Sequence, residues 1–433
     1  MCALKITRPI LWQLSNYTLL QAQTTTQTIA NSIRFYYTVK RKVAKDENYL
    51  SKHLYDKIRI KGPITVAEYM KVVLQNPMQG YYMSKDMFGE KGDFVTSPEI
   101  TQIFGEMLAV WFLNEWQKIG CPKPLQIIEL GPGRGTLSSD IVNVFSHFKA
   151  LHNASLHLVE ISPVLSDIQA GTLCLQSSLN NNKNALVYRH GISRHGIPVS
   201  WYKQLKDVPE GFTLLLAHEF FDALPIHKFH KTYAGYKEVL IDIDNSEEKE
   251  YKFRYVLAKN DTPMLKVLLK SNETRDHVEI SADSLLIYEQ ICQRLASSGG
   301  IALICDYGHN GTGTDTFRAF KKHTQVNPLV KPGTADLTAD VDFSLIRDIA
   351  NKTNDVLVFG PAKQKNFLQR IGIEHRVKAL AENMEDKKDV EHLNSCYKFL
   401  TEESKMGERF KFVALMPATM KKIIDKYPVV GFV

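Results

Sequence analysis

Three glycines at alternate positions mark the stretch of this chain with the clearest chemistry. Residues 125–130 form a short apolar run that ends at Gly131, a pattern typical of a buried parallel strand rather than an amphipathic helix. Gly133 and Gly135 follow, and Thr136 can cap a helix whose apolar residues recur at helical spacing. A turn without Cβ atoms lets a ligand approach the backbone, while the free N–H groups of a helix start favour a polar or anionic group. The sequence therefore predicts a ligand site at this junction.

The spacing of the glycines separates two classes of ligand. A dinucleotide fingerprint is Gly-x-Gly-x-x-Gly, but here the third glycine falls one residue early and Thr136 occupies its place. The pattern Glu129-x-Gly131-x-Gly133-x-Gly135 instead resembles the first motif of class I S-adenosylmethionine methyltransferases. A nicotinamide-linked oxidoreductase is therefore poorly supported, and a purely structural turn is the other alternative.

An acidic residue at the end of the next strand would complete such a cofactor site. Its carboxylate would accept hydrogen bonds from the two ribose hydroxyls. Residues 156–161 form a mostly apolar run with Glu160 at its tip, at about the separation expected of a βαβ unit. A solvated glutamate is the alternative interpretation.

The net charge of +7 is confined to the first forty-five residues, which contain no Asp or Glu. Without the seven cations of this segment, the Lys and Arg residues equal the 47 acidic residues, so the rest of the chain is formally neutral. A segment that lacks acids and is rich in Thr, Ser and Gln resembles a mitochondrial transit peptide. Arg34-Phe35-Tyr36 resembles a matrix-protease recognition sequence, so we expect a transit peptide over residues 1–36 and a location in the mitochondrial matrix. A disordered cytosolic tail is the alternative.

Composition excludes several other classes of protein. No apolar run approaches the roughly twenty residues that a membrane span requires. The six cysteines form no Cys-x-x-Cys pair, so neither a zinc site nor a disulfide framework is supported, and we expect no metal. Because the basic charge belongs to the leader, nucleic-acid binding is not expected either.

The remaining chain divides by pattern into a helical part and a sheet-forming part. Residues 46–120 read mostly as helices, one of which begins at Thr65 and ends before Pro77. Residues 121–433 alternate strands with helices, which predicts a doubly wound α/β sheet. Within them, residues of about 228–283 alternate apolar and polar side chains, which predicts an inserted antiparallel β-hairpin.

Two loops carry further candidate residues. Residues 213–217 form another buried strand, and His218, Glu219 and Asp222 follow it at the sheet edge where open α/β folds bind ligands. Asp306 follows a similar apolar run and is a candidate for the same side of the site, or else a turn residue.

The loop of residues 89–99 mixes glycines, charges and an aromatic residue, the composition of an active-site cover. Asp93, Thr96 and Glu99 are the residues of this loop that we expect to close over the cofactor. A plain turn between helices is the alternative.

Taken together, these motifs resemble the MidA family of mitochondrial arginine methyltransferases. The resemblance covers nearly all of the chain after the leader, and only its glycine motif is widely shared. The carrying segments are Gly62-Pro-Ile-Thr-Val-Ala-Glu-Tyr-Met70, Gly89-Glu-Lys-Gly-Asp-Phe-Val-Thr-Ser-Pro-Glu99, Glu129-Leu-Gly-Pro-Gly-Arg-Gly135, Ala217-His-Glu-Phe-Phe-Asp-Ala-Leu-Pro225, Asp306-Tyr-Gly-His309, Gly333-Thr-Ala-Asp-Leu-Thr-Ala-Asp-Val-Asp-Phe343 and Met406-Gly-Glu-Arg-Phe410.

The resemblance implies both a fold and an activity. The fold is that of class I S-adenosylmethionine methyltransferases, Rossmann-like with a seven-stranded, mostly parallel sheet, here with a helical N-terminal region and an inserted hairpin. The activity is symmetric dimethylation of an arginine on the 49-kDa-type subunit of respiratory complex I, needed for assembly of that complex. A non-catalytic assembly chaperone that keeps a methyltransferase fold is the alternative function.

The resemblance also assigns roles to the candidate residues. Carboxylates that bind a guanidinium in bidentate fashion orient one of its nitrogens, and Glu219 and Asp222 occupy the position that such enzymes use for acceptor recognition. His218 could assist proton loss, although a histidine at a strand end is more often structural. The sequence lacks the paired-glutamate loop of classical arginine methyltransferases, so the mechanism of that group does not transfer directly.

Overall fold

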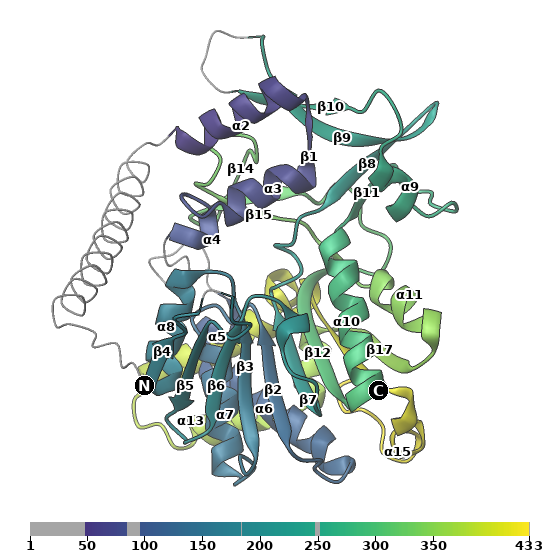
Figure 1. Cartoon of the computed structure of the whole chain (residues 1–433). Coiled ribbons are helices and arrows are strands. Elements are labelled where there is room, and N and C mark those ends of the chain that lie inside the picture. The colour runs from purple at the N-terminus through teal and green to yellow at the C-terminus, as the bar shows by residue number, and fades with distance from the viewer. Residues whose placement is uncertain (1–47, 85–95, 183, 247–251, 433) are drawn as a thin grey trace, which may run out of the picture.

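The computed structural model describes residues 48–84, 96–182, 184–246 and 252–432, and the predicted transit peptide and Asp93 lie outside these ranges. Two modules are visible in Figure 1. A large sheet covered by helices forms the module that we call the core module. A smaller module of helices and strands lies beyond the upper ends of the strands of that sheet, and we call it the upper module.

The core module is built on a mostly parallel sheet. Seven of its strands follow the order β6-β3-β2-β7-β12-β18-β17, in which β18 runs antiparallel to both of its neighbours. This order confirms the predicted seven-stranded class I methyltransferase sheet. These strands are β2 (Leu125–Leu130), β3 (Ala154–Val159), β6 (Pro198–Tyr202), β7 (Thr213–His218), β12 (Gly300–His309), β17 (Val356–Lys363) and β18 (Phe410–Pro417).

Three further described strands enlarge this sheet beyond the prediction. A hairpin extends the β6 edge in antiparallel fashion, and a two-residue strand pairs with the end of β12. The sequence did not predict this hairpin, because its outer strand, β4, is mostly exposed and therefore lacks an apolar face. These strands are β4 (Cys174–Leu179), β5 (Arg189–Ser193) and β16 (Val341–Asp342).

Helices cover both faces of the sheet because alternate strand residues point to opposite sides. Leu214 and Leu216 belong to one hydrophobic cluster, with α6, α7 and α12 to α14, whereas Leu215 and Ala217 belong to another, with α10 and α11. The helices of the core module are α5 (Ser97–Ile100), α6 (Gln102–Lys118), α7 (Thr136–His147), α8 (Pro163–Leu173), α10 (Ala282–Ser298), α11 (Ser344–Thr353), α12 (Gln364–Arg370), α13 (Ile373–Ala381), α14 (Lys387–Thr401) and α15 (Lys421–Lys426).

The upper module joins the first described helices to the insertion. Strand β1 pairs with β9, and β9 pairs with β10 in the antiparallel hairpin that the sequence predicts. Leu54 and Tyr69 from the N-terminal helices share one core with Ile241 of the insertion. The elements are α2 (Tyr49–Lys61), β1 (Ile64–Thr65), α3 (Val66–Gln75), α4 (Tyr81–Ser84), β8 (His227–Thr232), β9 (Gly235–Ile243), β10 (Phe253–Leu257), α9 (Pro263–Leu268), β11 (His277–Ile280), β13 (Arg318–Lys321), β14 (Thr324–Val326) and β15 (Asp336–Thr338).

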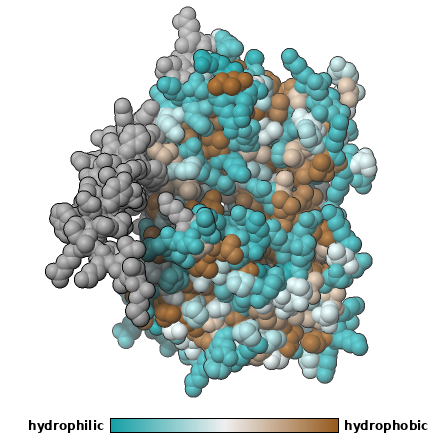
Figure 2. Space-filling model, in the orientation of Figure 1, coloured by the Kyte–Doolittle hydropathy of each residue, from teal (hydrophilic) through white to brown (hydrophobic). Residues whose placement is uncertain are grey.

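The surface in Figure 2 mixes hydrophilic residues with scattered hydrophobic ones over both modules. Within the described ranges, none of the helices has the length and apolar character that crossing a membrane would demand.

Helix α3 supplies part of the wall between the modules, and its first turn depends on Thr65. The Thr65 side chain accepts a hydrogen bond of 3.0 Å from the backbone N–H of Glu68. We expect Thr65→Ala to lower the free energy of unfolding by about 1 kcal/mol, measured by urea denaturation, because a helix-terminal donor loses its acceptor. Thr65→Ser should stay close to the wild type, and an equal loss in both variants would rule out the hydroxyl as the cause.

Candidate cofactor and acceptor site

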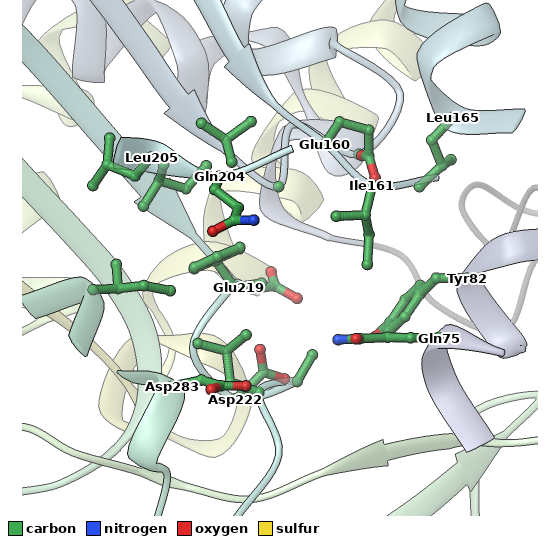
Figure 3. A pocket seen from close by; sticks show the side chains of 18 of the residues that line it. Gln75, Tyr82, Glu160, Ile161, Leu165, Gln204, Leu205, Glu219, Asp222 and Asp283 are labelled. Carbon is green, nitrogen blue, oxygen red and sulfur yellow. The ribbon is translucent and has the colours of Figure 1, made fainter. Parts of the chain in front are cut away.

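A cavity of about 610 Å³ lies where the parallel strands end and the upper module begins. Gly131, Glu160 and Glu219 follow β2, β3 and β7 on one side, and Gln75 and Tyr82 approach from the upper module. Figure 3 shows the carboxylate of Glu219 pointing into the open space between these walls. The volume is in the range of sites that bury a small-molecule ligand.

The glycine turn forms one end of this cavity. Gly131 and Gly133 line it, with φ angles of 61° and 54° that favour glycine. A Cβ on Gly131 would lie 2.7 Å from the Phe220 ring. Gly135 has a different role, since it precedes α7 with φ 83° and a Cβ there would lie 3.3 Å from Leu173 of α8. Two of the three glycines therefore face the cavity, and the third allows two helices to pack.

Glu160 is buried at the tip of β3, as the spacing of the sequence predicts. Its carboxylate accepts hydrogen bonds from the backbone N–H of Ser162 at 2.7 Å and from the side-chain amide of Gln169 at 3.0 Å. Burial raises the pKa of Glu160 to about 7, and these two donors oppose the shift. Because a carboxylate has about four acceptor sites, Glu160 can still accept hydrogen bonds from a ligand.

Glu129 lies beneath the same turn. It lines a small hollow of about 40 Å³ together with Gly131, Gly133 and Thr96. Burial raises the pKa of Glu129 to about 7, and the hydroxyl of Ser138, which donates to its carboxylate, lowers it. The carboxyl group of Glu129 therefore lies beside the turn and is largely shielded from water.

The end of the predicted cover loop reaches the glycine turn. Thr96 lines both the large cavity and the small hollow, and Glu99 lines the hollow. The Glu99 carboxylate accepts a hydrogen bond of 2.7 Å from the hydroxyl of Thr136 and lies 3.5 Å from the guanidinium of Arg134. Thr136 is thus not the cap that the sequence predicts, because Gly135 takes the cap position and Thr136 begins the helix. The remaining cover residue, Asp93, lies outside the described residues.

Glu219 and Asp222 face the cavity from the loop after β7. Glu219 has φ 48°, a left-handed conformation that is uncommon for a residue with a side chain. Burial, with a smaller effect from the Asp222 charge, raises the pKa of Glu219 to about 8. Burial also raises the pKa of Asp222, and the Tyr307 hydroxyl that donates to its carboxylate lowers it. The two acids therefore have unequal affinities for a proton.

Asp306 does not line the cavity, contrary to its candidacy for the acceptor side. It is fully buried behind the loop, and its carboxylate accepts hydrogen bonds from the backbone N–H groups of Phe220, Phe221 and Asp222 at 3.2, 3.0 and 3.4 Å. Burial raises the pKa of Asp306 well above its ordinary value. Asp306 thus holds the loop that presents Glu219 and Asp222.

His218 lines only the small hollow. Its ring packs edge-on against Phe104 with 5.1 Å between ring centres, and its Nε2 lies 3.6 Å from Glu219 Oε1. Burial lowers the pKa of His218 to about 3, which makes the imidazole a weak base. This environment favours the structural interpretation of His218.

Sequence reasoning missed two residues that the fold brings to the site, Asp336 and Gln169. Asp336 lines the cavity beside Asp222 and accepts a hydrogen bond of 2.7 Å from the hydroxyl of Tyr82. The acidic, glycine-containing segment 332–340 is a signal that could have identified Asp336. Gln169 carries no comparable signal, because a glutamine within a helix is ordinary. Among the residues in the described ranges, no His, Cys, Asp or Glu cluster could hold a metal ion.

Comparison with known proteins identifies relatives that match most of the chain. Residues 107–362 match the family model described as "Putative S-adenosyl-L-methionine-dependent methyltransferase". The chain is 51% identical over 370 residues to "Protein arginine methyltransferase NDUFAF7, mitochondrial" of Mus musculus, with 84% of each protein covered. It is 47% identical over 387 residues to the homologue of that protein in Drosophila melanogaster, with 88% of each covered.

Solved structures share the fold. A crystal structure from Burkholderia thailandensis bound to S-adenosyl-homocysteine has a TM-score of 0.69 and 23% identity, covering 87% of this chain and 93% of that one. A native crystal structure from the same organism has a TM-score of 0.67 and 22% identity, with the same coverage. The match to the family model and the identity to full-length relatives lead to one conclusion: the chain belongs to the family of S-adenosyl-L-methionine-dependent methyltransferases.

Proposed function

We propose that this protein is a mitochondrial protein arginine methyltransferase that symmetrically dimethylates an arginine of the 49-kDa-type subunit of complex I in the matrix, a step needed for complex I assembly. The observation that carries the arginine acceptor is the set of carboxylates facing one cavity beside the glycine turn: Glu219, Asp222 and Asp336. The names of the relatives support arginine as the acceptor and a mitochondrial location. The resemblance to the MidA family supports the subunit, the symmetric product and the transit peptide.

The residues at the turn fit S-adenosylmethionine. Gly131 and Gly133 leave the backbone open to the cavity, and Glu160 keeps acceptor capacity for ribose hydroxyls. Glu129, Gly135, Thr96 and Glu99 complete this proposed cofactor end, with Gly135 acting through helix packing, and Asp93 stays a prediction from sequence. When bound, this cofactor supplies a methyl group activated by a sulfonium.

The acceptor end fits a guanidinium. Arginine stays protonated in proteins because its pKa exceeds about 12. A carboxylate can accept two parallel N–H bonds from it, and in a site shielded from water such charge-assisted bonds strengthen. We propose that Glu219 and Asp222 bind the guanidinium in this way. Asp336 is a third acid near it, and the hydroxyl of Tyr82 orients its carboxylate.

The acceptor nitrogen must also lose a proton when it gains a methyl group. Glu219 is better suited to accept it than His218, because the pKa of Glu219 is about 8 whereas that of His218 is about 3. We therefore give His218 a packing role and Glu219 a double role in orienting the guanidinium and in taking its proton.

The enzymatic function is tested directly on complex I. We expect mass spectrometry to find a symmetrically dimethylated arginine on the 49-kDa-type subunit when the protein is present, and the unmodified arginine when it is deleted. An unchanged modification pattern would contradict the proposal. Assembled complex I in deletion cells that express a variant unable to bind the cofactor would instead support the chaperone alternative, for which the upper module would supply the binding surface.

Gly133→Ala should weaken binding of S-adenosylmethionine at least tenfold in a calorimetric titration, because the new methyl group enters the space beside the turn and the left-handed backbone resists a side chain. Gly196→Ala is the matched control. Gly196 also has a positive φ, of 79°, but lies in the β5–β6 turn with nothing within 4 Å of a Cβ. Both variants carry the backbone strain, so equal losses of affinity would remove Gly133 from the cofactor site.

Glu219→Gln should keep cofactor binding and lose most of the turnover on a peptide of the acceptor subunit, because the charge that grips the guanidinium is gone. Since the pKa of Glu219 is raised to about 8, the ionised form that binds the guanidinium accumulates as pH rises. For the wild type, kcat/KM should therefore rise with pH, reach half of its maximum near pH 8 and level off above that pH.

Steady-state kinetics from about pH 6 to about pH 9 check this profile, and the variant should lack the rise near pH 8. Glu289→Gln is the control, because Glu289 pairs with Lys352 at 3.6 Å on the outer side of α10 and is partly exposed. A wild-type profile in Glu219→Gln would show that Glu219 is not the group that titrates.

A further inference from the structure

Gln169 is hydrogen-bonded both to the glycine turn and to Glu160. It lies on α8, is fully buried, and does not line the cavity. Its amide nitrogen donates to the backbone carbonyl of Gly133 at 2.8 Å and to the carboxylate of Glu160 at 3.0 Å. Its amide oxygen accepts from the indole N–H of Trp201 on β6 at 2.9 Å. One side chain therefore contacts the glycine turn, the acid after β3, and the next strand of the sheet.

These partners fix the orientation of the amide. The nitrogen of Gln169 faces the carbonyl oxygen of Gly133, which cannot donate, and its oxygen faces the indole N–H of Trp201, which cannot accept. Reversing the amide would oppose acceptor to acceptor and donor to donor. With both amide N–H groups and the oxygen engaged, the side chain has one satisfied conformation. Glu160 is held in place through it.

We propose that Gln169 is a positioning residue for S-adenosylmethionine, which sets the distance and orientation between the Gly133 carbonyl and the Glu160 carboxylate. The inference rests on the cofactor of the family and does not depend on which acceptor is methylated. Gln169 would thus affect the affinity for the cofactor although its side chain does not line the cavity.

The hydrogen bond also has an electrostatic consequence. Glu160 is desolvated, and its bond from Gln169 favours the ionised carboxylate. Other charged or titratable groups near this end of the sheet are Tyr188, whose hydroxyl donates to the Glu160 backbone carbonyl at 3.0 Å, the Arg189–Asp167 ion pair, and Lys203 at the cavity wall. Removing the Gln169 amide leaves these groups in place, so the pKa of Glu160 should rise further.

The test measures binding of S-adenosyl-homocysteine by calorimetry across pH, with no methyl acceptor present. For the wild type, affinity should rise with pH through about 7 and then level off, because the ionised Glu160 is the better acceptor for ribose hydroxyls. Gln169→Leu, which keeps a similar volume, should weaken binding about tenfold or more and move the rise to higher pH. Glu160→Gln should bind weakly without this pH dependence.

A second variant keeps the test informative if Gln169→Leu folds poorly. Gln169→Glu retains the acceptor for Trp201 but replaces the donor with a carboxylate facing Glu160, so the rise should again move to higher pH. The matched control is Gln364→Leu. Gln364 is equally buried and its amide donates to the Leu400 carbonyl at 3.0 Å, but it joins α12 to α14.

We expect Gln364→Leu to lower the melting temperature without changing affinity or its pH profile. Folded Gln169 variants with wild-type affinity and pH profile would overturn the inference. Equal losses of affinity in the Gln169 and Gln364 variants would also overturn it, by showing only general destabilisation. Because no acceptor takes part, neither outcome bears on the arginine substrate.

Discussion

Buried carboxylates gather where the parallel strands of the core module end, and their desolvation constrains the rest of the site. Burial raises the pKa of Glu129, Glu160, Asp222 and Asp306. A buried acid is tolerated only where donors surround it. The donors here come from different places: a serine of α7, a glutamine of α8, a tyrosine of β12 and the backbone of the loop after β7. The elements around the cavity are therefore bound to one another through its acids.

Glu219 differs from these acids in its backbone, which is left-handed, and its pKa is raised to about 8. Its Oε1, like Oδ1 of Asp222, has no hydrogen-bond partner among the described residues. Strain and unmet hydrogen bonding of this kind persist only where the surrounding structure holds them, and they are concentrated at functional sites. The Asp306 carboxylate supplies the restraint by binding the next three backbone N–H groups. We infer that the fold keeps Glu219 available for a cationic group.

The upper module adds a second wall to the cavity at the ends of the parallel strands. Tyr82 and Asp336 are 254 residues apart in the chain, yet their side chains are hydrogen-bonded at the cavity wall. The N-terminal helices and the insertion reach this position together because they share one hydrophobic core. Asp222 and Asp336 are buried at this position, and the lower effective dielectric constant of a buried site strengthens charge interactions at the proposed acceptor end.

The sequence alone determined the parts of this protein that local pattern encodes. Runs of apolar residues gave the core strands, the glycine spacing gave the turn, and the distance to the next strand gave Glu160, because a βαβ unit brings neighbouring strand ends together. The tertiary structure alone decided that Gly135 packs rather than binds, that Asp306 stands behind the loop, and that Gln169 and Asp336 reach the site. Those outcomes depend on contacts between distant segments and on desolvation, neither of which residue spacing records.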